Sequence, residues 1–293
     1  MSPLRIHGLV FSLLALLAAA AAVLLPRMSP REELLVFAVL VAVLGVPHGA
    51  LDPIFARQLY GIGSPRGWIA FAVCYVALGA MVAGLWWLAP GVLLMLFLAA
   101  SAAHFSGDLA PGTPLVFRIF YGGAAIVFPV LLHAVEVSQL FAFLAGENAA
   151  NMLVAGLRWL AWPWLLGTAA CLLLTLKRDW LTGLEVASVS LLAIAVTPLL
   201  AFTVFFCGMH SARHALRTRH YAGLSVQRLL LVSAAPMAAV LAGSALAWHF
   251  LKASPLDMRV TQIVFIGLAA LTAPHMVLVE RVRFADWLKA PAP

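Results

Sequence analysis

Five histidines in this chain stand in short motifs whose imidazole nitrogens could bind a metal. His210 and His214 lie four residues apart in HSARH, and His48, His104 and His275 lie in PHGALD, AHFSGD and PHMVLVE. Residues at i and i+4 share one helix face, so the rings of His210 and His214 can converge on one point. Together with His48 and His104 they supply three or four nitrogen ligands for one transition metal. Imidazole suits zinc, copper, iron and nickel, so the ligand type alone does not choose the metal.

Acidic residues follow three of these histidines at a distance of four or five positions: Asp52, Asp108 and Glu280. Metal-bound histidines usually donate their second ring N–H to a carboxylate or carbonyl oxygen. We therefore expect these acids to support the ligands from outside, although acids at helix ends also pair with loop arginines. Arg213, between His210 and His214, is expected to point away from the metal and to pair with Asp52, Asp108 or Glu280, or with lipid phosphate.

The composition shows what kind of structure must position these side chains. The chain has 293 residues, of which 64% are hydrophobic and 10% charged, whereas soluble domains are about 45–50% apolar and about 25% charged. Such an excess of apolar side chains is too large for a protein core and must face lipid. Long unbroken apolar runs indicate spanning helices rather than barrel strands. We predict an all-α, polytopic integral membrane helical bundle.

We predict a single transmembrane domain, residues 1–293, that charged residues, prolines and glycines divide into nine or ten helices, with eight as a lower limit. The segment 183–216 could be a tight hairpin of two spans or one long helix kinked at Pro198. The predicted spans cover residues 8–25, 33–51, 68–89, 91–106, 115–133, 153–176, 183–197, 199–216, 226–250 and 260–280.

The distribution of basic residues orients the predicted bundle. The net charge of +7 comes from residues in short loops, which is a topology signal in a membrane protein and needs no nucleic acid partner. It places both termini on the cytoplasmic side of the cell (inner) membrane. All four histidine-bearing spans then run from outside to inside, so their five rings lie at similar depth. The basic residues on the predicted cytoplasmic side include Lys177, Arg178, Arg283 and Lys289.

The four motifs PHGALD, AHFSGD, HSARH and PHMVLVE together resemble the Brp/Blh family of membrane β-carotene 15,15′-dioxygenases, from about residue 33 to 283. The resemblance implies an iron(II)-dependent enzyme that cleaves the central double bond of a lipid-soluble carotenoid with O₂, giving retinal. It also implies that His48, His104, His210 and His214 bind the iron, with His275 as a nearby polar or ligand-supporting residue. The motifs depart from the family pattern at Pro53 and in HFSGD, so substrate choice or activity can differ.

Four aromatic residues near the histidines could form walls of a substrate tunnel, although aromatic residues in membrane helices are more often ordinary packing. They are Phe55, Phe105, Phe205 and Phe206. The apolar surroundings favour a lipid-soluble substrate and the exclusion of water.

Two other functions use buried histidines. A di-iron membrane desaturase or hydroxylase also has HxxxH spacing, but it needs more histidines than the five that cluster here. A transporter or proton relay would need a carboxylate deep within a span, where the chain offers only Glu185. Metal analysis separates these functions: one iron per chain indicates the dioxygenase, two the desaturase, and none transport. The oligomeric state stays open.

Overall fold

The computed structural model describes residues 2–175 and 179–282, and every regular element in these residues is a helix. Lys177, Arg178, Arg283 and Lys289, used above for orientation, lie outside the described residues. The first half of the chain forms α1 (Pro3–Leu24), α2 (Pro30–Leu40), the π-helix η1 (Val41–Gly45), the 3-10 helix η2 (Val46–Leu51), α3 (Asp52–Tyr60), α4 (Pro65–Leu88), α5 (Pro90–Phe105), α6 (Leu115–Val127), α7 (Pro129–Leu132) and α8 (Ala134–Ala145). The second half forms α9 (Glu147–Thr175), α10 (Trp180–Ala195), α11 (Pro198–Thr203), the π-helix η3 (Val204–Ser211), α12 (Ala212–Ala222), α13 (Val226–Phe250) and α14 (Leu256–Val282).

Three helices of the first half, α1, α2 and α4, each begin at a Ser–Pro pair. In each, the serine side chain accepts a hydrogen bond from a backbone N–H three residues later, and proline occupies the first turn. Serine satisfies a backbone donor that the helix leaves open, and proline loses nothing there because its missing N–H would have no partner. At α2 the side chain of Glu32 also accepts from the Ser29 N–H at 2.8 Å, completing a capping box.

Seven helices or helical runs among the described residues are long and apolar enough to cross a membrane. Their outward faces are apolar: Trp159 on α9 is 85% exposed and Leu88 on α4 is 81% exposed. No residue in the most apolar window of α4 is buried. Soluble monomers rarely expose apolar surface on this scale. The predicted fold class, an all-α polytopic membrane bundle, is confirmed.

Within the described residues each of the ten predicted spans falls mainly on helix, but three of them do not meet the length and composition of a spanning helix. Segments 91–106 and 183–197 correspond to α5 and α10, which have 16 residues each, and 199–216 lies in the run from α11 to α12. Val196 and Thr197 between α10 and α11 both have ψ of 146°, which is outside the helical region. The segment 183–216 is therefore two helical segments with a break and not one kinked helix.

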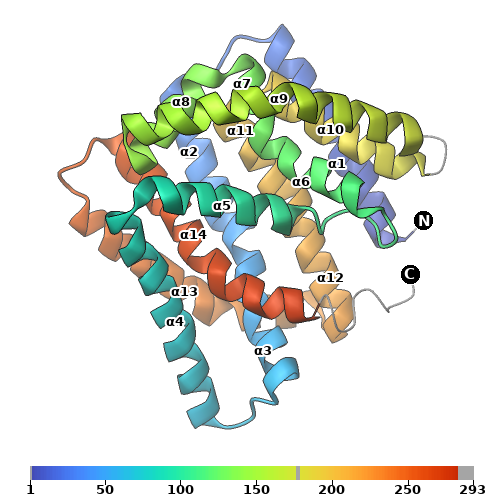
Figure 1. Cartoon of the computed structure of the whole chain (residues 1–293). Helices are drawn as coiled ribbons and strands as arrows, with labels where there is room; N and C mark the ends of the chain where they lie inside the picture. The colour runs from blue at the N-terminus through green and yellow to red at the C-terminus, as the bar shows by residue number, and fades with distance from the viewer. Residues whose placement is uncertain (1, 176–178, 283–293) are drawn as a thin grey trace.

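The helices pack side by side in one bundle (Figure 1), and the irregular helices η1, η2 and η3 contact one another within it. α9 packs along α8 and α1 along α10, while α14 packs against both α4 and α3. Between these pairs, η1 and η2 contact η3, and η2 also contacts α14. This arrangement brings α5, α14, η2 and η3 together, and these are the elements that carry four of the five motif histidines.

Candidate metal centre

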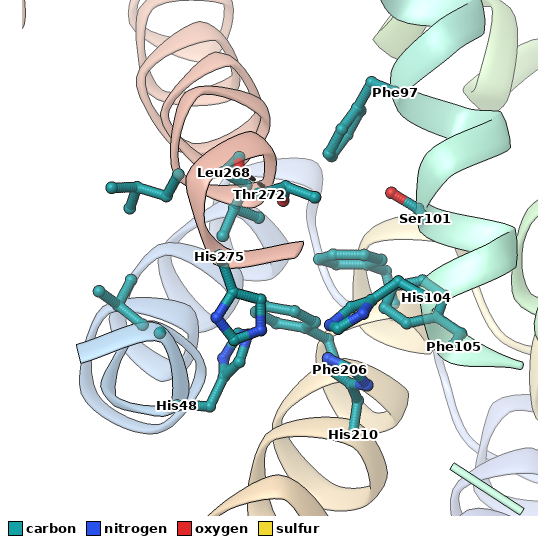
Figure 2. Close-up of a pocket in the computed structure, with 14 residues that line it drawn as sticks. His48, Phe97, Ser101, His104, Phe105, Phe206, His210, Leu268, Thr272 and His275 are labelled. Atoms are coloured by element: carbon teal, nitrogen blue, oxygen red, sulfur yellow. Dashed lines mark hydrogen bonds between the residues drawn. The ribbon is translucent and has the colours of Figure 1, made fainter. Parts of the chain in front are cut away.

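The structure brings the five motif histidines together in one buried cluster. Ring centroids are 4.7 Å apart for His104 and His210, and 5.1 Å apart for His48 and His210. His275 lies 5.1 Å from both His48 and His104, and His214 lies 5.2 Å from His275. Each of the five side chains belongs to a residue less than one-tenth exposed. Figure 2 shows four of the rings converging from separate segments.

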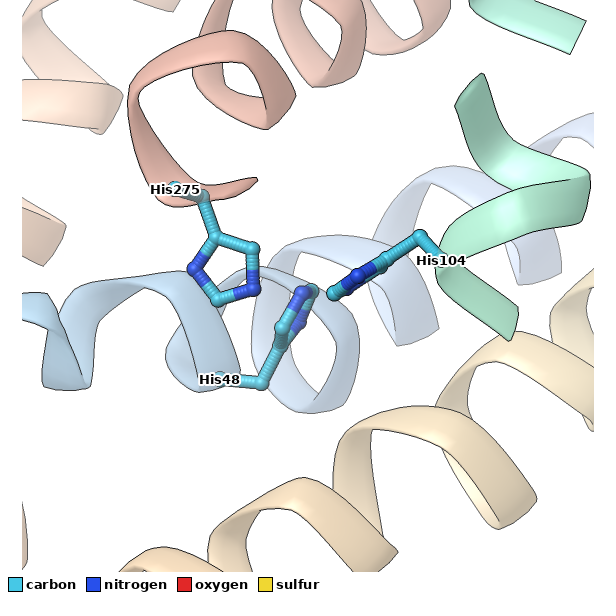
Figure 3. Close-up of side chains that lie close together, drawn as sticks. All are labelled: His48, His104 and His275. Carbon is cyan, nitrogen blue, oxygen red and sulfur yellow. The ribbon is translucent and has the colours of Figure 1, made fainter. Parts of the chain in front are cut away.

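Three of these histidines have ring nitrogens close enough to share one metal ion. His48 on η2, His104 on α5 and His275 on α14 each offer a ring nitrogen, and these nitrogens all lie within 4.8 Å of one another. Figure 3 shows the three rings pointing toward one another from three helices. Such a spacing suits a shared metal ion. This group contains His275, which the resemblance treats only as a nearby polar or supporting residue.

Irregular backbone at η1 and η2 orients the ring of His48. Nδ1 of His48 lies 2.5 Å from the carbonyl oxygen of Gly45, where the π-helix changes to the 3-10 helix. The hydroxyl of Ser211, in η3, lies 3.1 Å from the same Nδ1 and 3.2 Å from the Gly45 carbonyl. Because a carbonyl can only accept, the short contact requires a proton on Nδ1. Nε2 is then the ring nitrogen with a lone pair for a metal.

Asp52 supports a different histidine from the one that its sequence position suggests. It lies four residues after His48, but its Oδ1 is 2.7 Å from Nδ1 of His275 on α14. Its other oxygen, Oδ2, accepts a hydrogen bond of 2.7 Å from the hydroxyl of Tyr75 on α4. Asp52 is 1% exposed, so it links α3, α14 and α4 inside the bundle. Nothing in the sequence singled out Tyr75.

Asp108 likewise contacts a histidine from another helix. Both of its carboxylate oxygens lie 3.1 Å from Nδ1 of His210, although its sequence neighbour is His104. Its backbone carbonyl accepts hydrogen bonds from Arg213 at 2.8 Å and from Arg217 at 2.7 Å. These two guanidinium groups fix the turn after α5 and hold the carboxylate against the ring of His210.

Replacing Asp108 with asparagine is expected to weaken metal binding about 10- to 100-fold, the usual effect of losing a carboxylate that orients a ligating histidine. The asparagine amide can turn its NH₂ group toward Nδ1 and so favour the wrong tautomer of His210. Competition of the purified protein with a chelator measures the affinity. Asp257→Asn, at an exposed aspartate in the first turn of α14, is the matched control. An Asp108→Asn protein with the control's affinity would contradict this role.

Glu280 does not share the face of α14 that carries His275. Five residues of α-helix correspond to a rotation of roughly 140° between the two side chains. Glu280 is half-buried, whereas His275 is 3% exposed. Of the three acids expected to support the ligands, Asp52 and Asp108 contact histidines of the cluster, and Glu280 lies on another side of its helix.

Arg213 contacts one of its three expected acids, Asp108, but only at the backbone carbonyl, and its carboxylate partner is Glu185. Its two terminal nitrogens donate to Glu185 on α10 at 3.0 and 2.5 Å, and the two residues are 3% and 4% exposed. Asp52, Asp108 and Glu280 lie near the histidines in the sequence, whereas Glu185 lies 28 residues before Arg213. An ionisable residue inside an apolar span needs a partner, and this applies equally to Glu185, which the sequence offered as the one deep acid.

A narrow apolar cavity begins at the histidines and runs between α5 and α14 (Figure 2). Of the expected tunnel walls, Phe105 and Phe206 line it. Phe206 is stacked on Phe202 with ring centroids 5.1 Å apart and planes 13° apart, forming a flat aromatic wall. The other lining side chains come mainly from the histidine-bearing faces of two helices, namely Phe97 and Ser101 of α5 and Leu268, Leu271 and Thr272 of α14.

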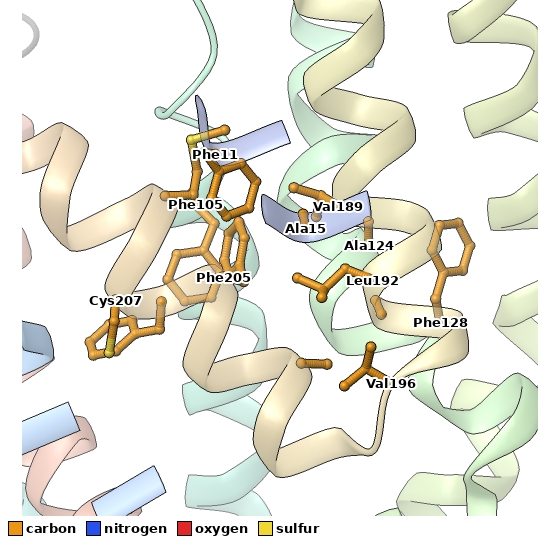
Figure 4. Packing of buried hydrophobic residues seen from close by; sticks show 14 of the residues in the cluster. Phe11, Ala15, Phe105, Ala124, Phe128, Val189, Leu192, Val196, Phe205 and Cys207 are labelled. Atoms are coloured by element: carbon orange, nitrogen blue, oxygen red, sulfur yellow. The ribbon is translucent and has the colours of Figure 1, made fainter. Parts of the chain in front are cut away.

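The other two expected walls, Phe55 and Phe205, do not line this cavity. Phe205 packs 5.0 Å from Phe105 and 6.1 Å from Tyr121, inside the hydrophobic cluster of Figure 4. It points there because consecutive residues of a helix project in different directions, so Phe205 and Phe206 cannot face the same way. Phe55 is fully buried and lies 5.6 Å from the ring of His214. It supports the cluster from behind.

Several wall residues that we did not predict follow from helical spacing. Phe97 and Ser101 precede His104 by seven and three positions, and Leu268 and Thr272 precede His275 by the same intervals. Residues at i, i+4 and i+7 share one helix face. Extending each histidine's face toward the N-terminus of its helix would have found these residues.

An all-helical membrane bundle with five buried histidines at the end of an apolar cavity defines the chain as a membrane protein with a polyhistidine centre. The family model described as "Beta-carotene 15,15'-dioxygenase" matches residues 39–283. The chain therefore belongs to this family, and the predicted class, a carotenoid-cleaving oxidoreductase, is confirmed. α1 and most of α2 precede the matched region.

Two curated relatives agree with this assignment. The chain is 28% identical over 252 residues to "Beta-carotene 15,15'-dioxygenase" of the uncultured marine bacterium 66A03, which covers 82% of this chain and 90% of the relative. It is 27% identical over 304 residues to "Probable beta-carotene 15,15'-dioxygenase Blh" of Halobacterium salinarum, covering 90% of this chain and 88% of the relative. No solved structure matches the chain.

Proposed function

We propose that this chain is a membrane-embedded, non-haem iron(II) dioxygenase that cleaves β-carotene, or a related carotenoid, at its central double bond with O₂ to give retinal. The observation that carries the proposal is the cluster of buried imidazoles at the end of an apolar cavity. The names of both relatives specify β-carotene and the 15,15′ bond, and the family match extends that expectation to this chain.

The histidine cluster fits a divalent transition metal. Within the described residues, Nε2 of His104, His210 and His275 is buried and has no hydrogen-bond partner. Leaving a buried polar atom without a partner is costly, and a bound metal ion would satisfy all three. The resemblance assigns the iron to His48, His104, His210 and His214, which are neutral nitrogen ligands suited to iron(II). When bound, iron supplies the activation of O₂, which no protein side chain can perform.

The chain's own residues would position the substrate and exclude water. The cavity is lined by Phe97, Leu268 and the stacked pair Phe202 and Phe206, so it presents a flat apolar wall to a flat polyene. α5 and α14 carry His104 and His275 at the ends of the faces that line the cavity. A carotenoid lying between these helices would place one of its double bonds beside the histidines.

The membrane and the orientation are part of the same proposal. The basic loops favour a cell-membrane protein with both termini in the cytoplasm, in which the histidine cluster lies toward the cytoplasmic side. A carotenoid dissolved in the bilayer could then reach the cavity without crossing water. Membrane lipids would contact the outer faces of the seven apolar helices.

Expression in a bacterium that accumulates β-carotene tests this function. We expect loss of colour together with the appearance of retinal, and about one iron per purified chain. Cells with the empty vector control for spontaneous oxidation. Persistent colour in cells that contain folded, iron-loaded protein would rule out β-carotene as the substrate. Feeding other carotenoids to the same cells then tests whether Pro53 and the HFSGD segment have changed the specificity.

A further inference from the structure

His275 makes the same two kinds of contact as His210, which the family resemblance makes a ligand. In His210, Nδ1 faces the carboxylate of Asp108 at 3.1 Å, and Nε2 is buried without a hydrogen-bond partner among the described residues. In His275, Nδ1 lies 2.7 Å from Asp52, and Nε2 is likewise buried without a hydrogen-bond partner among the described residues. A role as ligand that is argued for His210 from its environment therefore applies equally to His275.

The position of His275 in the cluster is central. Its ring centroid lies 5.1 Å from those of His48 and His104 and 5.2 Å from that of His214. Its ring nitrogen belongs to the group within 4.8 Å that also contains His48 and His104. In Figure 3 the ring points at the other two and not along the surface of α14. A metal ion held between His48 and His104 would lie beside His275.

The surroundings of Asp52 fix which nitrogen of His275 faces the cluster. One carboxylate oxygen of Asp52 contacts Nδ1 of His275, and the other accepts the hydroxyl hydrogen of Tyr75 at 2.7 Å. A carboxylate that is anchored in this way favours the tautomer with its proton on Nδ1, which leaves the lone pair on Nε2. A hydrogen-bonded packing histidine would have no need of a second nitrogen that is buried and without a partner.

We propose that His275 is a direct ligand of the metal, together with His48 and His104, and that Asp52 and Tyr75 are its positioning residues. The inference rests on the proposed metal centre and changes its ligand set from four imidazoles to five. The metal site then connects η2, α5, η3, α12 and α14, so that every segment that carries a motif histidine is held by the ion.

Cobalt(II) is a suitable probe, because imidazole binds it and its visible absorption reports the ligand set. We expect His275→Ala to lower the cobalt affinity of the purified protein by at least about 100-fold, and Asp52→Asn by about 10- to 100-fold. The matched control is His220→Ala, at an exposed histidine in the last turn of α12, which should keep the affinity and spectrum of the unmodified protein.

Rescue with free imidazole separates a ligand from a packing group. In His275→Gly, added imidazole can occupy the space of the missing ring and should restore the cobalt spectrum, whereas Gly substitution at His220 should show no response. A His275→Ala protein with unchanged affinity and spectrum would overturn the inference. If His275→Ala does not fold, Asp52→Asn and Tyr75→Phe test the inference, because both variants keep the ring of His275. Unchanged cobalt affinity and spectrum in both variants would also overturn the inference.

The same measurements distinguish a failure of the proposed function from a failure of the role of His275. An unmodified protein that binds neither iron nor cobalt would refute the metal centre as a whole. An unmodified protein that binds both metals, with a His275→Ala variant that does so equally well, would leave the metal centre standing and refute only the role of His275.

Discussion

Replacing His210 with alanine is expected to abolish both iron binding and retinal formation. The imidazole of His210 lies 4.7 Å from His104 and 5.1 Å from His48, and its loss would also leave the carboxylate of Asp108 buried without its histidine. We expect the apparent affinity for iron to fall by at least about 100-fold, because even the loss of a group that only orients a ligand costs about 10- to 100-fold. Metal analysis of the purified protein and retinal formation in carotenoid-accumulating cells measure the two effects.

The control for this experiment is His220→Ala, which removes an exposed imidazole ten residues later in the same helical run. It should keep both the iron and the activity. Far-ultraviolet circular dichroism of both variants shows whether the helices remain. A folded His210→Ala protein with one iron per chain would remove His210 from the ligand set.

Replacing Glu185 with alanine is expected to destabilise the fold more than any other substitution of a charged residue described above. Glu185 holds both terminal nitrogens of Arg213 at 2.5–3.0 Å, and both side chains are at most 5% exposed. Without the carboxylate, the guanidinium of Arg213 stays buried without its counter-charge, which typically costs about 3–5 kcal/mol. Unfolding of the detergent-solubilised protein by denaturant measures the loss.

Two variants test whether the loss comes from the unpaired charge. Glu136→Ala removes an acid that is 40% exposed and lies 3.7 Å from Arg27 and 3.5 Å from His133, so it should cost no more than about 1 kcal/mol. The double variant Glu185→Met with Arg213→Met removes both charges and fills part of their volume, and it should recover much of the stability. If Glu185→Ala were as stable as Glu136→Ala, the pair would not contribute to the fold.

The helices could be predicted from the sequence because the length of each apolar run alone identifies them. Within the described residues all ten predicted spans fall mainly on helix, and the breaks at Pro90 and Pro198 coincide with helix starts. Seven helices or helical runs among the described residues have the length and composition of a spanning helix, whereas α5 and α10 have only 16 residues each, so the number of spans that cross the membrane stays a prediction. A hydrophobic run does not show whether its helix faces lipid or lies within the bundle.

The structure brings together the five histidines that the sequence predicted to lie at one level, and the direction of their helices across the membrane stays a prediction. The partners of the supporting acids did not follow from the sequence. Asp52 and Asp108 were matched to the histidines four residues before them, because spacing along one helix is all that a sequence displays. In the structure they contact His275 and His210, which depends on how separate helices pack. The π-helices η1 and η3 could not be predicted either, because no residue type marks an extra residue in a helical turn.

The ion pair of Glu185 and Arg213 has a consequence for how the chain enters the membrane. A Cβ atom at Gly8 of α1 would lie 1.9 Å from Oε1 of Glu185, so α1 covers the pair and carries no side chain at that point. During synthesis α1 emerges long before Glu185 and Arg213. Gly8, the residue of α1 beside this pair, is uncharged and needs neither of them as a partner. Glu185 and Arg213, by contrast, are 28 residues apart and would each be costly alone in lipid. The segments from α10 to α12 should therefore leave the translocon as one unit, with their charges already neutralised, and then dock against an α1 that is already in place.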